Sequence, residues 1–203
     1  MEGNSYLEFI IPGMVIMVVM QTSYSHISEI IINMKQIGSF NDYLIAPISR
    51  VELCIAFLFT SIFIGLFVGL INIGILSFFT SFESINFFQI FYYLILTAII
   101  FSCFGSITGF LSFTWDVQSS ISSFIIVPIS FLSGTFFSIN SLDKNWRFIF
   151  EYNPFYYLVS NFRRAFYEIY LINYIIEILI IVFVIVILFI SLFIFNRGYK
   201  VIN

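Results

Sequence analysis

Residues 171–195, LINYIIEILIIVFVIVILFISLFIF, contain a single charged side chain, that of Glu177. A helix of about 20 apolar residues is long enough to cross the hydrocarbon core of a bilayer. This stretch therefore predicts a membrane-spanning helix. Its continuous apolar character favours a helix over the alternating strands of a membrane barrel.

Four further stretches of the same kind precede it along the chain. They run over residues 7–27, 53–82, 85–115 and 117–142. The chain is 61% hydrophobic and only 9% charged, whereas soluble domains carry about 25% charged residues. We therefore expect an all-α, polytopic transmembrane helix bundle of about five spans, which forms one domain over residues 1–203.

Polar residues gather between the expected spans, in residues 28–50, 114–120 and 141–170, and in the tail 196–203. Loops rich in Lys and Arg mark the cytoplasmic side. The eight Lys and Arg residues divide evenly between the two sides of a five-span bundle, so charge alone leaves the orientation open. Within residues 156–170, apolar residues recur at helical spacing with polar residues between them, which predicts a helix at the membrane interface.

The chain offers little to a catalytic or metal site. His26 is its only histidine, and the two cysteines, Cys54 and Cys103, fall inside apolar runs. We therefore expect no metal, no cofactor and no catalytic residue. No glycine is followed by lysine, so the phosphate-binding loop of ATPases is absent, and any ATP-driven role requires a partner. For Glu177, a residue facing a cavity and a carboxylate reaching toward the interface are both open interpretations.

Two pairs of glycines have the spacing of close helix packing: Gly65-x-x-x-Gly69 and Gly105-x-x-x-Gly109. Small residues at this spacing let helix backbones approach one another. We expect these four glycines to pack helices within the bundle or across a dimer. A net charge of −3 gives no basic field for nucleic acid.

Several short motifs resemble, in order, those of the ABC type-2 exporter permeases. Phe9-Ile-Ile-Pro-Gly-Met14 is similar to the F-x-x-P-G opening of that family's second span. Lys35, Asp42-Tyr-Leu-Ile-Ala-Pro47 and Ser49-Arg-Val-Glu52 resemble its cytoplasmic signature between the second and third spans. Ser133-Gly-Thr-Phe-Phe-Ser138, Asn153-Pro-Phe-Tyr156 and Phe162-Arg163 resemble its region before the last span. The ordered set covers essentially the whole chain, and the branch it most resembles exports lipo-oligosaccharides, nodulation factors and polysaccharides.

The resemblance implies a permease subunit in the bacterial inner membrane, paired as a homodimer, in contact with membrane lipids and driven by a separate ABC ATPase subunit. Residues 28–50 would form the cytoplasmic coupling loop that docks on the ATPase, and residues 141–170 an external re-entrant hairpin before the last span. The coupling residues would be Lys35, Asp42, Pro47, Arg50 and Glu52. The residues of the external segment would be Gly134, Asn153, Pro154, Tyr156, Phe162 and Arg163.

In that family a first span normally precedes the F-x-x-P-G segment. Here Met1 lies only a few residues upstream of it, so we expect that this first span is missing or supplied elsewhere. The substrate class stays open among lipid-linked saccharides, drugs and other amphipathic molecules. A membrane enzyme acting on lipid-linked substrates and a passive channel or scaffold are the alternatives. An enzyme would need clustered acids, histidines or a metal site, and a channel would need polar rings.

Overall fold

The computed structural model describes residues 6–39, 48–80, 86–137, 150, 152–167 and 173–197, and every regular element among them is helical. Five helical segments are long and apolar enough to cross a membrane. They are α1 (Tyr6–Ile37), α3 (Arg50–Leu76), α4 (Phe87–Leu111), the segment Trp115–Leu132 and α9 (Tyr174–Arg197). The expected all-α bundle of five spans is thus confirmed.

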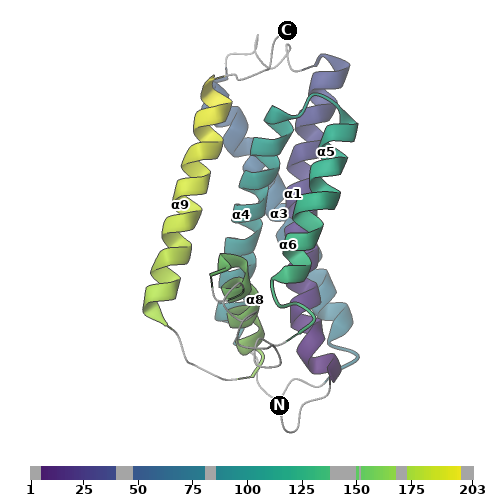
Figure 1. The fold of residues 1–203 in the computed structure, drawn as a ribbon, viewed down its shortest axis with the longest axis vertical. Coiled ribbons are helices and arrows are strands. Elements are labelled where there is room, and N and C mark those ends of the chain that lie inside the picture. Colours follow the sequence, from purple (N-terminus) through teal and green to yellow (C-terminus); the bar gives the residue numbers. More distant parts are fainter. Residues whose placement is uncertain are drawn as a thin grey trace.

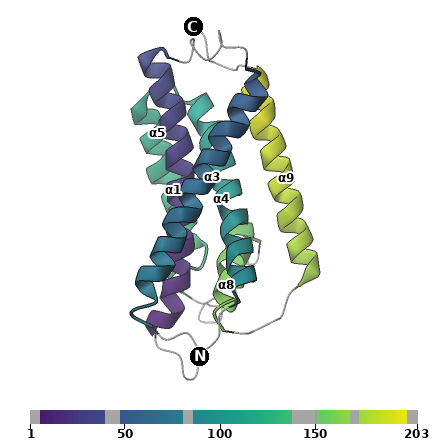
Figure 2. The same ribbon diagram turned by 180° about the vertical axis from the view of Figure 1, so that it is seen from behind.

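The five spans alternate in direction along the long axis of the bundle (Figure 1). The α1, α4 and α9 helices end at the same end of the molecule, where α3 and α5 begin (Figures 1 and 2). The fourth span is built from three consecutive pieces: α5 (Trp115–Ile121), the π-helix η1 (Ser122–Ile126) and α6 (Val127–Leu132). The short helix α8 (Pro154–Arg164) lies beside the spans at the opposite end (Figure 1).

Helix boundaries follow from local hydrogen bonding. Ser49 caps the start of α3 by accepting from the backbone N–H of Glu52, while the Glu52 carboxylate accepts from the Ser49 N–H. This reciprocal capping box satisfies N–H groups that have no partner within the helix. Asn86 caps α4 and Thr114 caps α5 by one such hydrogen bond each, in which the side-chain oxygen accepts from a backbone N–H of the first turn.

The centre of the bundle is α4, which packs most extensively against α1. The large buried side chains of this core include Tyr24, Met20, Leu94 and Phe101. In contrast, α3 and α9 expose rows of large apolar side chains, such as Phe59, Phe63 and Phe67 on α3 and Ile185 and Phe189 on α9. Such faces are stable against lipid, and they agree with the hydropathy of these spans.

The first helix is longer than the sequence analysis predicts. Residues 28–50 are expected to form a loop, but α1 continues through Ile37. The extension is held by Ile27 and Ile31, which pack in a cluster with Phe110 of α4. The charged residues of this stretch hide its helical spacing of apolar residues, because they lie on the other faces of the same helix.

Candidate functional site

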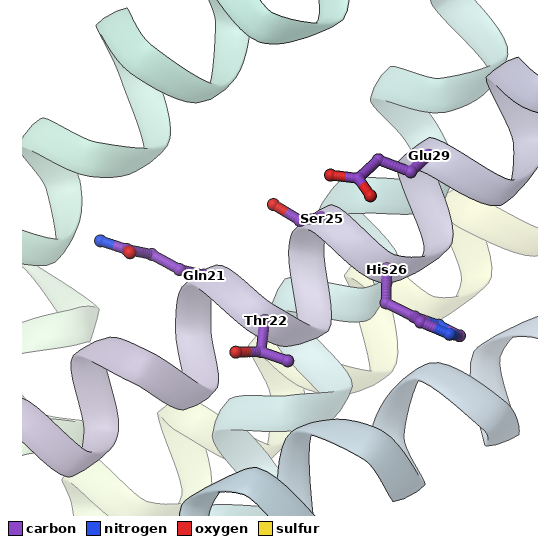
Figure 3. Close-up of a pocket in the computed structure, with 5 residues that line it drawn as sticks. All are labelled: Gln21, Thr22, Ser25, His26 and Glu29. Atoms are coloured by element: carbon purple, nitrogen blue, oxygen red, sulfur yellow. The ribbon is translucent and has the colours of Figure 1, made fainter.

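A row of polar side chains runs along the middle of α1. Gln21, Ser25 and Glu29 are spaced four residues apart and lie along one side of the helix, with Thr22 and His26 on the adjacent side (Figure 3). These five residues line a groove of about 360 Å³, which we call the α1 groove. Polar side chains within a membrane span are costly unless they face protein or a water-filled cavity, so they indicate a functional surface.

His26 lies within this groove, although it stands next to the last residue of the expected span 7–27. The reason is the extension of α1 to Ile37, which moves the end of the helix three turns past His26. Its ring nitrogen Nδ1 is buried and has no hydrogen-bond partner among the described residues. A buried polar atom without a partner is unusual in a folded protein, and the His26 ring points away from Gln21, Ser25 and Glu29 (Figure 3).

Three separate sequence motifs meet at the buried side chain of Arg163, at the end of the bundle where α1 begins. Its Nε donates to the carbonyl of Phe9, 3.0 Å away, and its Nη2 donates to the carbonyls of Gly134 and Thr135, at 2.9 and 3.2 Å. The guanidinium also stacks over the Phe9 ring, 3.8 Å from its centroid. Gly13 completes the junction, because a Cβ there would lie 2.7 Å from the Thr135 carbonyl oxygen.

Arg163 is one of the polar residues within 156–170, the stretch expected to form an interfacial helix, but the structure buries it. It is 9% exposed, and burial lowers the pKa of its guanidinium to about 10, which leaves it charged at neutral pH. The apolar spacing of this region does form a helix with Leu158, Val159 and Phe162 buried, as predicted. The carbonyl groups that accept from Arg163 come from segments far away in the sequence. The spacing of apolar residues around Arg163 therefore could not identify these acceptors.

The other residues expected in the external segment shape the start of α8 and its contact with α6. Asn153 caps α8 by accepting from the Phe155 N–H, and Pro154 occupies its first turn. Gly134 has a left-handed φ of 77° and packs against the ring of Tyr156. A positive φ strains residues with a side chain, which explains the glycine at this point. The re-entrant hairpin over residues 141–170 stays a prediction, since much of it lies outside the described residues.

The expected coupling residues divide into three groups. Lys35 lies in the last turn of α1, and its amine donates to backbone carbonyls at the end of α4. Arg50 and Glu52 lie in the first turn of α3, at the same end of the bundle; Arg50 Nη1 donates to the Asn196 carbonyl of α9 at 3.2 Å. Asp42 and Pro47 lie outside the described residues.

The two glycine pairs lie where other helices approach α1. A Cβ at Gly69 would lie 2.6 Å from Val19 Cγ2, and one at Gly105 would lie 2.6 Å from Ile27 Cγ2. Gly65 faces Ser23, and Gly109 faces the α1 backbone at Ser28. Among the described residues, Gly65 and Gly69 pack α3 onto α1, and Gly105 and Gly109 pack α4 onto α1. These contacts lie within one chain, which is one of the two kinds of packing that the glycine spacing allows.

The buried acid Glu177 forms a polar cluster that spacing did not predict. It lies in the first turn of α9 and accepts hydrogen bonds from Tyr93 and Tyr92 of α4 and from Asn161 of α8. The Asn161 bond is 2.9 Å long and the Tyr92 bond 3.3 Å. Since its partners come from two other elements, Glu177 ties α9 to α4 and α8. No group of three or more potential metal ligands occurs among the described residues.

Comparison with known proteins places the chain in a family. The family model described as ABC-2 type transporter matches residues 2–167. The "Inner membrane transport permease YadH" of Escherichia coli strain K12 is 30% identical over 169 residues, which make up 83% of this chain and 66% of the relative. The YadH permeases of Escherichia coli O157:H7 and Shigella flexneri match to the same extent.

The chain thus matches just under two thirds of the length of these relatives. Their inner-membrane location agrees with the five membrane-length helices, so this is a multi-pass inner-membrane protein. The family match covers the F-x-x-P-G motif, the region between α1 and α3, and the Arg163 junction. The chain belongs to the ABC-2 type transporter family.

Proposed function

We propose that this chain is the transmembrane permease subunit of an ATP-driven exporter, powered by a separate ABC ATPase subunit. The observation that carries the proposal is the α1 groove, a polar surface about 12 Å long on a helix that is otherwise apolar enough to span a membrane. Membership of the ABC-2 type transporter family and the relatives named transport permeases support it.

The groove favours an amphipathic substrate with hydrogen-bonding groups. Amide, hydroxyl, imidazole and carboxylate side chains line it, so it can both donate and accept hydrogen bonds. The apolar spans around it suit a lipid or aromatic portion of the same molecule. A lipid-linked saccharide fits both properties, and a polar drug is the other member of this class. We place the substrate on the α1 groove and the exit at the Arg163 junction.

The ATPase docks, in this proposal, on the end of the bundle where α1 ends and α3 begins. Residues 40–47, which connect these helices, contain the motif that resembles the family's coupling signature. This end faces the cytoplasm, and the Arg163 junction faces outward. Two copies of the chain pair in the membrane, each with one ATPase, and nucleotide-driven closure of the ATPase pair shifts the spans between two states.

The proposal is tested by affinity purification of the tagged chain, in mild detergent, from membranes in which the neighbouring ATPase is co-expressed. A P-loop ATPase in stoichiometric amount is the expected result. A chain that purifies alone contradicts the proposal.

Charge reversal then locates the docking surface. Asp42→Lys and Arg50→Glu are expected to uncouple ATP hydrolysis from export, because they reverse charges on or next to the docking segment. Arg197→Glu is the matched control: Arg197 lies at the same end of the bundle, but its guanidinium lies over the Phe193 ring of its own helix. Unchanged export in both docking variants would remove the assignment of this surface.

A further inference from the structure

The end of α1 is fastened to the corner between α4 and α5, residues 109–118, by a lysine. The Lys35 amine donates to the backbone carbonyls of Gly109, Phe110 and Ser112, at 2.9, 2.5 and 3.1 Å. The last carbonyls of a helix have no partner within the helix, and a cation there also interacts favourably with the helix dipole. One amine on α1 therefore provides a hydrogen-bond donor for three backbone carbonyls at the end of α4.

Two amides add links between the same elements. Gln36 Nε2 on α1 donates to the Phe113 carbonyl in the corner, at 2.9 Å. In the reverse direction, Gln118 Nε2 on α5 donates to the buried Ser28 hydroxyl on α1, at 2.8 Å. The amides thus hold the corner from both sides of the Lys35 contact.

Close packing leaves little room for the two elements to move independently. A Cβ at Gly109 would lie 3.1 Å from the Ser28 Cα, so the backbones of α4 and α1 nearly touch. The Lys35 amine also lies over the Phe110 ring, 5.3 Å from its centroid. The α1 end and the corner are therefore joined by charge, hydrogen bonds and packing at once.

The fourth span is joined to α1 at its other end as well. There, Arg163 donates hydrogen bonds to the carbonyls of Thr135 and Phe9, and Gly13 packs directly on Thr135. Gln118 meets Ser28 at one joint and Thr135 meets Gly13 at the other, so η1 lies beside the stretch of α1 between them, which includes most of the α1 groove. A π-helical turn is a common place for a helix to bend and often marks a functional site.

We propose that Lys35 is a positioning residue that carries the nucleotide-driven displacement of the docking segment from α1 into α5. The α1 end and the α4–α5 corner move as one body, the fourth span bends at η1, and the α1 groove widens or narrows. This inference rests on the proposed function, because it requires an ATPase that moves the docking segment. It reassigns Lys35 from an ATPase contact to a link inside the permease.

The experiment is a distance measurement by pulsed electron paramagnetic resonance on the chain in nanodiscs with its bound ATPase. Spin labels are placed at Val117 on α5 and Phe59 on α3, both exposed, after Cys54 and Cys103 are replaced by serine. Distances are compared without nucleotide and with ATP plus vanadate. With Lys35 intact, the distance is expected to change on trapping.

In Lys35→Met the change is expected to be lost while the ATPase stays bound and hydrolyses ATP. Lys35→Arg, which keeps a cation and several donors, is expected to retain it. Gln36→Leu removes only the link to Phe113, so it is expected to fold normally and show a smaller change. Arg197→Met, a matched loss of positive charge at the same end, is expected to behave like the parent chain.

The outcomes separate the two proposals. If the parent complex binds its ATPase and shows the distance change, but Lys35→Met and Gln36→Leu show the same change, the inference about Lys35 is wrong and the proposed function stands. If the parent chain binds no ATPase, or its distance does not respond to nucleotide, the proposed function itself is contradicted and the inference falls with it.

Discussion

Gly105 lies where α4 approaches α1 so closely that a side chain has no room. A Cβ at this position would contact the Tyr24 carbonyl and lie 2.6 Å from Ile27 Cγ2. We expect Gly105→Ala to lower the free energy of unfolding by about 1–3 kcal/mol, because overpacking forces two helices apart. Thermal unfolding in detergent, followed by circular dichroism, measures the effect.

Gly74 of α3 provides the matched control for this prediction. It is also a helical glycine, but no atom of the described residues lies within 4 Å of a Cβ placed there. Gly74→Ala is expected to leave stability unchanged or to raise it by up to about 1 kcal/mol, since alanine restricts the unfolded chain. Equal unfolding temperatures for the two variants would contradict the account of helix packing at Gly105.

Arg163 is the second residue whose replacement has a defined cost. Arg163→Met leaves the carbonyls of Phe9, Gly134 and Thr135 without their charged donor, and we expect a loss of about 3 kcal/mol. Arg163→Lys is expected to recover only part of this, because one amine cannot reproduce the planar fork that reaches both Phe9 and the turn after α6.

The stability of the Arg163 variants is compared with that of Arg50→Met. Arg50 is exposed, and within the described part of the chain it donates one hydrogen bond, to Asn196 at 3.2 Å, so its loss is expected to cost no more than about 0.5 kcal/mol. Thermal unfolding together with limited proteolysis near α8 reports the difference. Full stability of Arg163→Lys would show that the number of donors does not matter at this junction.

At the scale of elements, the attachment of α8 and α9 to α4 depends on the Glu177 cluster. Tyr93 is buried and donates to the carboxylate, whereas Tyr92 donates a bond of 3.3 Å from a half-buried position. We expect Tyr93→Phe to destabilise the protein by about 1–3 kcal/mol, because the buried carboxylate loses a donor. Tyr92→Phe, the matched control, is expected to cost clearly less.

Hydrogen exchange of the α8 and α9 backbone amides reports whether the same cluster holds these helices. Faster exchange in both helices of Tyr93→Phe, with little change in Tyr92→Phe, is the expected pattern. If the two variants exchange alike, Glu177 is not the link between the elements.

The elements differ in how far their sequence predicts them. The five spans follow from hydropathy, because the membrane requires long apolar helices. The extension of α1 could have been found from the spacing of Ile27 and Ile31, which hydropathy alone ignores. The π-helix η1 could not, since the stretch Ser122–Ile126 has no local pattern that separates a π turn from an α turn.

For the whole molecule, the sequence shows which motifs form the functional sites, but it does not show which residues contact one another there. The F-x-x-P-G motif and the Arg163 motif are visible as separate strings, but only the fold brings Phe9 and Arg163 together. Lys35 is visible as a charge near a docking segment, yet its acceptors lie on α4, more than seventy residues away. Tertiary contacts of this kind have no local signal.

The central claim is that an ATPase changes the exposure of a polar groove in the membrane, and accessibility of the groove tests it most directly. A cysteine replaces Ser25, and Cys54 and Cys103, which are buried, are replaced by serine so that only the groove is labelled. The chain and its ATPase are prepared in inside-out membrane vesicles and treated with a water-soluble maleimide, with and without ATP.

The account predicts that Ser25→Cys is labelled in the absence of nucleotide and that ATP changes the labelling rate. A cysteine at Phe63, on the lipid-facing side of α3, is expected to react slowly in both conditions. Labelling at Ser25 that is the same with and without ATP, or equal to that at Phe63, would contradict the account.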